Sequence, residues 1–496
     1  MTAYLGIDLG TSELKATLVD EEQRILAAAG SPLEVSRPHP LWSEQDPAEW
    51  WRAACEVMDR LAAEHPEIMK QVRGIGLSGQ MHGAVLLGEK DNVLRPAILW
   101  NDGRSGEECL ELTRREPNLA TISGNLAMPG FTAPKLLWVS RHEPDIFRAT
   151  ACVLLPKDWL RLKLSGEKKS DMSDASGTLW LDVGKRAWST ELLRACGLNE
   201  EQMPGLLEGS AAGGVLLPEL AERWNMGKGV IIAGGGGDNA ASAVGIGAVK
   251  PGDGFISLGT SGVLFVCNER FSPNPAQAVH AFCHALPGRW HQMSVILSAA
   301  SCLKWVTALT ARPGEGDLLR EVAELSEGKR RRAPVFLPYL SGERSPHNNP
   351  HAKGVFHGLT AGHAAADLGY AVIEGVSFAL RDGLAALQAA GTEVESLSLV
   401  GGGARSVEWA QLLASALGVE IVTHTGSETS GAIGAARLAR LAVEGPGRER
   451  EICTAPPVSA RYRPDSDVAG ALERRYGLFR RLYRDLEDTF VAGEDD

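Results

Sequence analysis

The four residues Leu-Gly-Thr-Ser occur twice in this chain, once near its start and again about halfway along its 496 residues. Each copy lies between two short apolar runs, which are residues 4–8 and 14–19 for the first copy and residues 255–258 and 263–267 for the second. Apolar runs on both sides of a glycine-containing turn are typical of a β-hairpin. A repeat with the same context at half the chain length indicates a duplicated domain.

The duplication predicts an α/β fold with two related domains, each of which opens with a hairpin. A chain of 496 residues has room for two to four domains of ordinary size, so two large ones are a simple solution. The second Leu-Gly-Thr-Ser copy sets the position of the boundary. We therefore predict domains at residues 1–245 and 246–496.

A strand-helix-strand pattern in the second half supports the α/β class. Residues 396–400 read as a strand, and three glycines separate it from a helix that begins near Ser406 and ends at Gly418. Residues 419–423 form the next predicted strand. In open α/β sheets, ligands bind at the carboxyl ends of the strands, which is where this glycine turn lies. A long apolar pattern over residues 366–390 predicts a core helix.

Charge and composition exclude several classes of protein. The formal net charge of −12 disfavours a nucleic-acid or anionic-membrane partner, because both require a basic face. The most apolar stretch, residues 230–249, contains Asp238 and several glycines, so we predict no membrane span there. The eight cysteines include no CxxC pair, and the first residues carry no export signal. We expect a cytoplasmic protein with reduced thiols and without a structural zinc site.

The two hairpin turns combine glycine with hydroxyl side chains, and such turns can bind phosphate oxygens through backbone N–H groups. The residues concerned are Gly10, Thr11, Ser12, Gly259, Thr260 and Ser261. A single copy would be best interpreted as an ordinary hairpin turn. Two copies, one in each half, favour phosphates that are held between two domains.

Asp8 directly precedes the first of these turns. A carboxylate beside a phosphate site repels the phosphate unless a cation lies between them, and Mg²⁺ bound through water would remove this conflict. A turn-capping aspartate explains the residue equally well.

Four glycines and an acid, residues 234–238, follow an apolar strand and start a helix of small residues. Glycines let a ligand approach the backbone closely. Asp238 at a helix start is also an ordinary N-cap, and a carboxylate kept ionised there suits a general base for a substrate hydroxyl. The P-loop pattern GxxxxGK[ST] is absent from the chain, and GxGxxG does not follow the first strand, which argues against P-loop enzymes and dehydrogenases.

Two polar loops in the first half have the composition of sugar-binding sites. They combine an aromatic or apolar surface with amide, acid, imidazole and guanidinium groups. The candidates are Met81, His82, Trp100, Asn101, Asp102 and Arg104. Polar packing within the loops is the alternative interpretation.

Taken together, these motifs resemble the FGGY family of carbohydrate kinases over nearly the entire chain. The matching segments are YLGIDLGTS (4–12), RPHPLWSEQD (37–46), GQMHG (79–83), RPAILWNDGR (95–104), PGFTAPKLLWV (129–139), residues 233–241, SLGTSG (257–262), AVHAFCHAL (278–286), YLSGERSPHNNPHAKGVFHGL (339–359) and LVGGGARS (399–406). Residues 426–432 (GSETSGA) depart from the usual family wording. The resemblance implies two actin-like (ribonuclease H-like) ATPase domains that face a central cleft.

The resemblance also implies an activity, which is transfer of the γ-phosphoryl group of ATP to O5 of D-xylulose in pentose catabolism, with Mg²⁺. By similarity, Asp238 is the base that accepts the O5 proton and Asp8 acts near Mg²⁺ and the phosphates. Met81 and His82 would contact the sugar. The remaining implied ligands are Gly259, Thr260 and Ser261 for phosphate, and Gly401, Gly402, Gly403, Ala404 and Ser406 around the adenosine.

Three alternatives remain open at the level of sequence. Another sugar kinase of the family, such as a ribulokinase or a gluconokinase, would differ in its pocket residues. An actin-like filament or chaperone ATPase would lack the two sugar-type loops, and a sugar sensor would not need Asp238. The oligomeric state is also open, with a homodimer as one option.

Overall fold

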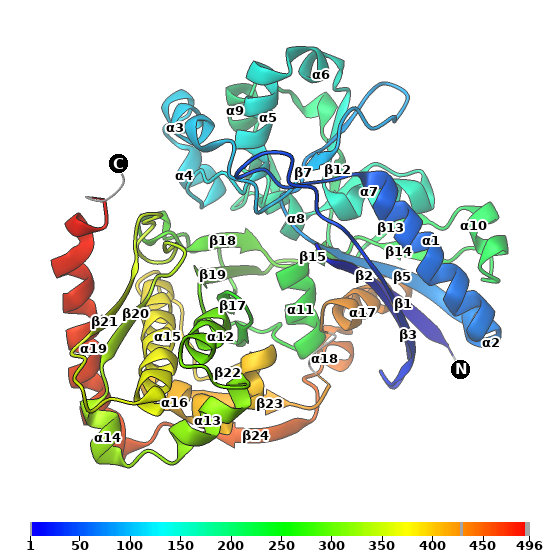
Figure 1. Cartoon of the computed structure of the whole chain (residues 1–496). Helices are drawn as coiled ribbons and strands as arrows, with labels where there is room; N and C mark the ends of the chain where they lie inside the picture. The colour runs from blue at the N-terminus through cyan, green and yellow to red at the C-terminus, as the bar shows by residue number, and fades with distance from the viewer. Residues whose placement is uncertain (1, 427–429, 492–496) are drawn as a thin grey trace.

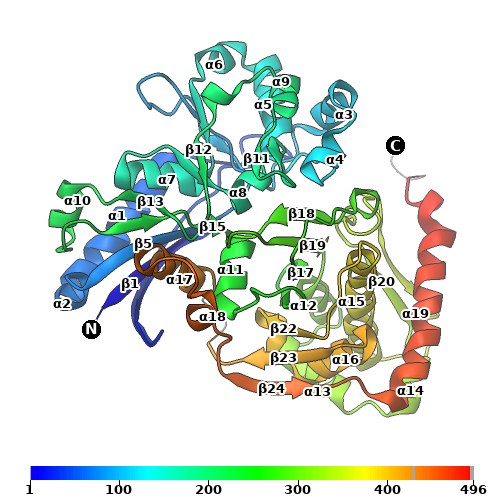
Figure 2. The same cartoon turned by 180° about the vertical axis from the view of Figure 1, so that it is seen from behind.

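The computed structural model describes residues 2–426 and 430–491, so part of the unusual segment 426–432 lies outside the described residues. Figures 1 and 2 show two lobes, with helices α11 (Asp238–Ile246) and α17 (Ser430–Glu444) side by side between them. The first lobe carries the N-terminus, and the second ends in the long helix α19 (Ser466–Leu486).

The first lobe is built on a mixed sheet in the spatial order β3-β2-β1-β5-β14-β13, with β15 paired to β5. Its strands are β1 (Ala3–Leu9), β2 (Glu13–Asp20), β3 (Ile25–Pro32), β5 (Val72–Gly79), β13 (Ala212–Val215), β14 (Ile231–Ala233) and β15 (Gly236–Gly237). The β1–β2 and β2–β3 pairs are antiparallel, the β1–β5 and β5–β14 pairs are parallel, and β13 is antiparallel to β14.

The second lobe repeats this pattern in the order β19-β17-β16-β22-β23-β24, with β18 added beside β19. Its strands are β16 (Gly254–Leu258), β17 (Gly262–Asn268), β18 (His280–Cys283), β19 (Trp290–Ile296), β22 (Ser396–Val400), β23 (Glu420–His424) and β24 (Val458–Tyr462). Corresponding pairs have the same parallel or antiparallel sense as in the first sheet. The duplication seen in the two Leu-Gly-Thr-Ser turns therefore extends to both whole sheets.

Helices cover both sheets, and short strand pairs connect the loops. The other helices of the first lobe are α1 (Pro47–Glu64), α2 (Pro66–Met69), α3 (Gly106–Arg115), α4 (Leu119–Ser123), α5 (Thr132–His142), α6 (Pro144–Ala149), α7 (Pro156–Ser165), α8 (Met172–Ser176), α9 (Thr190–Ala195) and α10 (Pro218–Arg223). Those of the second are α12 (Ala300–Leu309), α13 (Glu315–Ala323), α14 (Glu327–Arg332), α15 (Ala365–Gln388), α16 (Val407–Leu417) and α18 (Glu449–Ile452). The short pairs are β4 (Glu44–Gln45) with β7 (Ala97–Ile98), β6 (Val85–Leu87) with β8 (Cys152–Leu154), β9 (Lys169–Asp171) with β12 (Gly205–Leu207), β10 (Leu181–Asp182) with β11 (Ala187–Trp188), and β20 (Val335–Pro338) with β21 (Gly354–His357).

Side-chain alternation along the first strand of each sheet separates two packed faces. In β1, Leu5 and Ile7 join the apolar core that contains α1 and α7, whereas Tyr4 joins a different core with residues of α17. In β16, Ile256 joins the core with α15, and Phe255 joins the core that contains residues of α11. Each sheet is thus covered on one face by its own helices and on the other by one helix of the central pair.

The central pair can approach so closely because glycines occupy the contact points. A Cβ atom on Gly6 of β1 would lie 1.8 Å from the carbonyl oxygen of Ala432, and one on Gly76 of β5 would lie 1.7 Å from that of Ala435. Likewise, a Cβ on Gly434 of α17 would lie 1.8 Å from the carbonyl oxygen of Ala241 in α11. Backbone therefore packs directly on backbone where the two lobes join.

The elements predicted from local pattern are confirmed. Both hairpins form, the helix predicted at 366–390 is α15, and α16 begins after its cap Ser406 and ends at Gly418 in the left-handed conformation (φ 73°). Within the described residues, no helix combines the length and the apolar character that crossing a membrane requires.

The substitution Gly76→Ala tests the central contact. The added methyl group must displace the α17 backbone, and overpacking of this kind costs at least about 1–3 kcal/mol of the free energy of unfolding. Differential scanning calorimetry should show a clear fall in Tm. The matched control is Gly477→Ala in α19, where a Cβ meets nothing within 4 Å and alanine should leave Tm unchanged or raise it. Equal Tm values for the two variants would contradict the proposed role of the contact.

Candidate functional site

A cavity of about 270 Å³ lies between the lobes, with lining residues from both halves of the chain. The first half contributes Met81, His82, Trp100, Asp238 and Asn239. The second half contributes Ser261, Val263, His280, Phe282, Met293, Val295 and Arg344. The cavity thus unites the predicted base, the predicted sugar loop and one residue of the second Leu-Gly-Thr-Ser turn.

Asp238 is the first residue of α11 and follows the glycine run, as the sequence predicts, although the N-cap position itself belongs to Gly237. The run needs glycine for steric reasons. A Cβ on Gly234 would lie 2.2 Å from the carbonyl oxygen of Glu208, and Gly235 has a positive φ of 77°. The chain can therefore turn sharply between β14 and α11 and present Asp238 to the cavity.

The carboxylate of Asp238 accepts hydrogen bonds from the backbone N–H (2.7 Å) and the side-chain amide (2.9 Å) of Asn239. Burial, together with the nearby charge of Asp8, raises the pKa of Asp238 to about 6. The group is then ionised at pH 7 yet much more basic than an exposed aspartate. These are the properties of a general base that works near neutral pH.

Asp8 lies at the carboxyl end of β1, where it accepts a hydrogen bond of 2.8 Å from the hydroxyl of Ser78. Burial raises the pKa of Asp8, against the lowering effects of Ser78 and Lys15. The negative charge of Asp8 contributes to the raised pKa of Asp238, and two carboxylates in one cleft attract a cation. Among the described residues, no group of three His, Cys, Asp or Glu side chains is arranged to hold a metal alone. A single carboxylate still fits Mg²⁺, which keeps several waters and binds substrate phosphates.

His82 adopts a left-handed backbone conformation (φ 69°) that directs its ring to the cavity wall. Burial lowers the pKa of His82 to about 3, so the imidazole is neutral. Its Nδ1 lies 2.7 Å from the carbonyl oxygen of Gly177, which requires the proton on Nδ1. The other ring nitrogen, Nε2, is then an acceptor for a hydroxyl group. Met81 lies beside it in the cavity wall.

Trp100 lines the same cavity and is connected to the first Leu-Gly-Thr-Ser turn. Its indole N–H donates to the Thr11 hydroxyl (3.0 Å), which itself donates to the side chain of Gln80 (2.9 Å). The amide of Gln45 donates to the carbonyl oxygen of Thr11 at 2.7 Å. The Thr11 hydroxyl therefore serves to hold the loops together, and the turn offers backbone groups at its tip.

The other residues of the predicted second sugar loop lie apart from the cavity lining. The Asp102 carboxylate accepts hydrogen bonds from Nε and Nη2 of Arg104 (2.9 and 2.7 Å) and from the backbone N–H of Ser43 (2.6 Å). The Arg104 guanidinium also stacks 3.6 Å above the ring of Trp42. Both side chains are buried, whereas Asn101 is exposed. Here the geometry assigns Asp102 and Arg104 to a buried ion-pair cluster, and their contact with sugar stays a prediction.

In both hairpin turns the glycine donates its N–H back across the turn, but the loops differ in length: Gly10 donates to the carbonyl oxygen of Glu13 and Gly259 to that of Ser261. The carbonyl oxygens of Gly259 and Thr260 accept N–H groups from the start of α12, which holds the second turn in place. Ser12 and Thr260 lie exposed at the turn tips.

The glycine turn after β22 lies against the same strand end. A Cβ on Gly403 would lie 2.4 Å from Cδ2 of Leu258, the last residue of β16. Gly401 has φ 90°, and Gly402 meets nothing within 4 Å. Ala404 is half-buried, and the Ser406 hydroxyl caps α16 by accepting the N–H of Trp409 (3.2 Å). The predicted phosphate and adenosine turns are therefore neighbours.

Sequence reasoning did not single out His280, Phe282 and Arg344 as site residues, although all three line the cavity. The Arg344 guanidinium lies 3.5 Å from Nε2 of His280. Burial raises the pKa of the adjacent Glu343 to about 8, so this neighbour does not neutralise the arginine at pH 7. The only sequence signal was their occurrence in segments that match the family. Nothing in their local sequence indicated that they would line the same cavity as Asp238.

Comparison with known proteins now adds to this geometry. Residues 3–245 match the N-terminal domain model of the FGGY family of carbohydrate kinases, and residues 254–443 match its C-terminal domain model. A xylulose kinase of Escherichia coli (strain K12) is 52% identical over 484 residues, covering 97% of this chain and 99% of the relative. The solved structure of a xyloylose kinase from Brucella ovis is 52% identical with a TM-score of 0.95, covering 98% of this chain and all of that one.

A third similarity concerns the fold. The solved structure of a xylulose kinase from Rhodospirillum rubrum is 29% identical, has a TM-score of 0.91 and covers 98% of this chain and 99% of that one. The two duplicated sheets and the cavity between them are those of the actin-like carbohydrate kinases. The chain belongs to the FGGY family and is an enzyme that phosphorylates a carbohydrate.

The acid limb of the pH–rate profile tests the electrostatics of the site. If Asp238 is the base, kcat/KM for the carbohydrate should fall as the pH drops through about 6, because the protonated carboxyl cannot accept a proton. Asp8→Asn removes a charge that raises the pKa of Asp238, so the limb of its residual activity should move to lower pH. Glu13→Gln removes a carboxyl from the same hairpin and should leave the limb in place. If the acid limb of Asp8→Asn lies at the same pH as that of the wild type, Asp8 does not raise the pKa of Asp238.

Proposed function

We propose that this chain is a xylulose kinase, which phosphorylates D-xylulose with ATP to give D-xylulose 5-phosphate. The observation that carries the proposal is the identity of about half of all residues with xylulose kinases over nearly the full chain, together with a cavity that unites Asp238, His82 and Met81. A place in pentose catabolism follows from the reaction. Ribulokinase and gluconokinase activities are not favoured by the relatives.

Phosphoryl transfer requires little covalent chemistry from the protein, which must position two substrates and balance their charge. Asp238 accepts the proton of the sugar hydroxyl as O5 attacks the γ-phosphorus of ATP. The bond between O5 and phosphorus forms while the bond from phosphorus to the bridging oxygen breaks, and ADP leaves. A base with a pKa of about 6 is ionised at pH 7 and retains basicity for this step. The glycine run before it leaves space for the hydroxyl to approach.

Sugar recognition is assigned to groups from both lobes. His82 accepts a hydroxyl hydrogen bond at Nε2, and the Arg344 guanidinium donates to sugar oxygens from the other lobe. Trp100 and Met81 provide apolar surface for the carbon chain. Because the cavity walls come from two lobes, closure around the sugar would exclude water from the reaction.

We assign the nucleotide to the second lobe. Residues 1–245 would then bind the sugar, and residues 246–496 would bind the nucleotide. The backbone at Gly259, Thr260 and Ser261 would bind phosphate, and the turn from Gly401 to Ser406 would flank the adenosine. The first turn, Gly10 to Ser12, would face the phosphates from the other lobe. Asp8 would hold Mg²⁺ through water, and Mg²⁺ when bound supplies neutralisation of phosphate charge.

A substrate panel tests the proposed function. In a coupled assay of ADP release, D-xylulose should give the highest kcat/KM among pentuloses, polyols and aldonates, because relatives that are about half identical over nearly the full chain are xylulose kinases. L-ribulose, gluconate and glycerol are the controls that represent other kinases of the family. A clearly higher kcat/KM for one of these controls would replace D-xylulose as the substrate and leave the family unchanged.

The substitution Asp238→Asn tests the base. The amide keeps the shape of the side chain but cannot accept the proton, so kcat should fall by about 10²–10⁴-fold. Isothermal titration should show that D-xylulose still binds, since His82 and Arg344 are intact. Turnover at the wild-type rate would remove Asp238 from the mechanism.

A further inference from the structure

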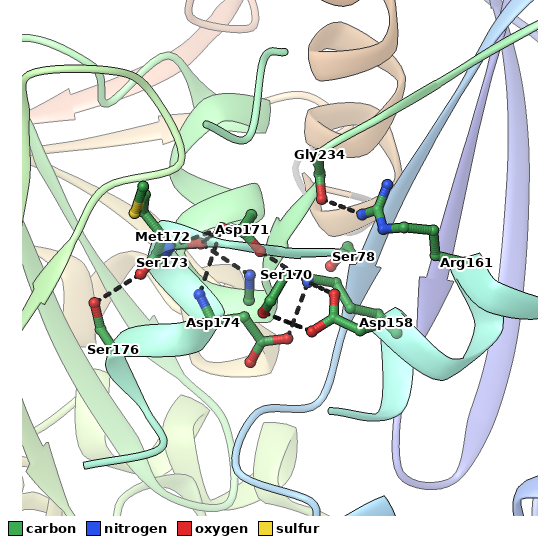
Figure 3. A network of polar contacts seen from close by, with 12 residues as sticks. Ser78, Asp158, Arg161, Ser170, Asp171, Met172, Ser173, Asp174, Ser176 and Gly234 are labelled. Atoms are coloured by element: carbon green, nitrogen blue, oxygen red, sulfur yellow. Dashed lines mark hydrogen bonds and ion pairs between the residues drawn. The ribbon is translucent and has the colours of Figure 1, made fainter. Parts of the chain in front are cut away.

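A buried cluster of charges lies directly behind the glycine run that carries Asp238 (Figure 3). It comprises Lys157 and Asp158 at the start of α7, Arg161 one turn later, and Asp171 and Asp174 around α8. All five side chains are fully buried. None of them lines the cavity, so the reaction itself does not use them.

Lys157 is the centre of this cluster. Its ammonium group lies 2.5 Å from Oδ1 of Asp158, 2.8 Å from Oδ1 of Asp171 and 3.2 Å from Oδ2 of Asp174. The two cations face three carboxyl groups, and burial raises the pKa of Asp174 well above its usual range. This shift favours the neutral form of Asp174, and the ion pairs with Lys157 offset the cost of burying the other charges.

The cluster fixes α8 through Asp171. One oxygen of its carboxylate, Oδ2, accepts hydrogen bonds from the backbone N–H of Ser173 (2.8 Å) and from the Ser173 hydroxyl (2.5 Å). The other oxygen is held by Lys157. The first turn of this short helix, including the Ser173 rotamer, is therefore set by the buried charges.

Ser173 passes this constraint to the catalytic loop. Its hydroxyl oxygen accepts the backbone N–H of Gly237 at 3.1 Å, and Gly237 is the residue before Asp238. At the other end of the run, Arg161 donates to the carbonyl oxygen of Ala233 (2.6 Å) and to that of Gly234. The glycines, which have no side chains of their own to hold them, are thus fixed at both ends by one cluster.

The far end of α8 contacts the sugar loop. Gly177 follows α8 directly, and its carbonyl oxygen accepts the Nδ1 proton of His82. A Cβ on Gly177 would lie 2.5 Å from Nδ1 of His82, so the two groups are in close contact. One rigid element therefore lies between the base loop and the imidazole that faces the cavity.

We propose that α8 is the positioning element of the active site and that Ser173 is its positioning residue, which holds the backbone before Asp238 through the hydrogen bond to Gly237. The inference rests on the proposed function, because it gives Asp238 the role of base. A displacement of about 1 Å at a reacting group can cost about 10²-fold in rate, so a bond at this place affects kcat more than sugar binding.

The test compares Ser173→Ala with Ser170→Ala. Both serines are fully buried in the same cluster, but the Ser170 hydroxyl donates to Asp158 (2.6 Å) and has no bond to the glycine run. Both variants should show a similar decrease in Tm relative to the wild type. In Ser173→Ala, kcat for D-xylulose should fall about 10–100-fold while its KM and its calorimetric Kd stay within about 3-fold. In Ser170→Ala, kcat should stay within about 3-fold of the wild type.

Arg161→Lys gives a second measurement if Ser173→Ala does not fold. The lysine keeps the charge but loses the two-carbonyl contact at the other end of the run, so kcat should again fall with little change in KM. Equal kcat values in Ser173→Ala and Ser170→Ala, or a rise in KM with unchanged kcat, would overturn the positioning role. Absence of D-xylulose turnover in the wild-type enzyme would instead refute the proposed function, before any variant is compared.

Discussion

Direct backbone contact at the centre of the molecule is the constraint on which the structure depends. Helix α17 lies on Gly6 and Gly76 of the first sheet, and its Gly434 lies on Ala241 of α11. A side chain at any of these points would separate the helices from the sheet or from each other. Since α11 begins at Asp238, the same contact also sets the distance between the two lobes at the cavity.

This contact explains why the charge of Asp8 contributes to the raised pKa of Asp238. Asp8 lies near the carboxyl end of β1 and Asp238 starts α11, so close packing brings two carboxyl groups to one edge of the sheet. A Cβ on Gly431, at the start of α17, would lie 2.8 Å from Oδ2 of Asp8, which shows how little space surrounds that group. The raised pKa values of both aspartates are thus consequences of packing. The buried charge cluster also fixes the glycine run before Asp238 through hydrogen bonds to its backbone, because glycines have no side chains that could do so.

Sequence reasoning succeeded where the signal was local. The two hairpins, the βαβ unit that ends at Gly418 and the run of glycines before Asp238 each depend on neighbours within a few residues. For WNDGR the outcome is divided, since Trp100 lines the cavity and a sugar contact of Asp102 and Arg104 stays a prediction. Asp102 and Arg104 pair with each other, and the Arg104 guanidinium stacks on Trp42, which lies far from it in the sequence.

The sequence by itself determined the duplicated architecture, the family and the glycine loop that carries Asp238, because strand periodicity, turn glycines and family motifs are encoded over short stretches. Only the tertiary structure decided which groups meet across the lobes. Arg344 and His280 line the same cavity as Asp238 although they lie in the other half of the chain, and Lys157 reaches Asp171 and Asp174 from a different helix. Such contacts depend on the packing of whole helices and sheets, and no periodic pattern in the sequence predicts them.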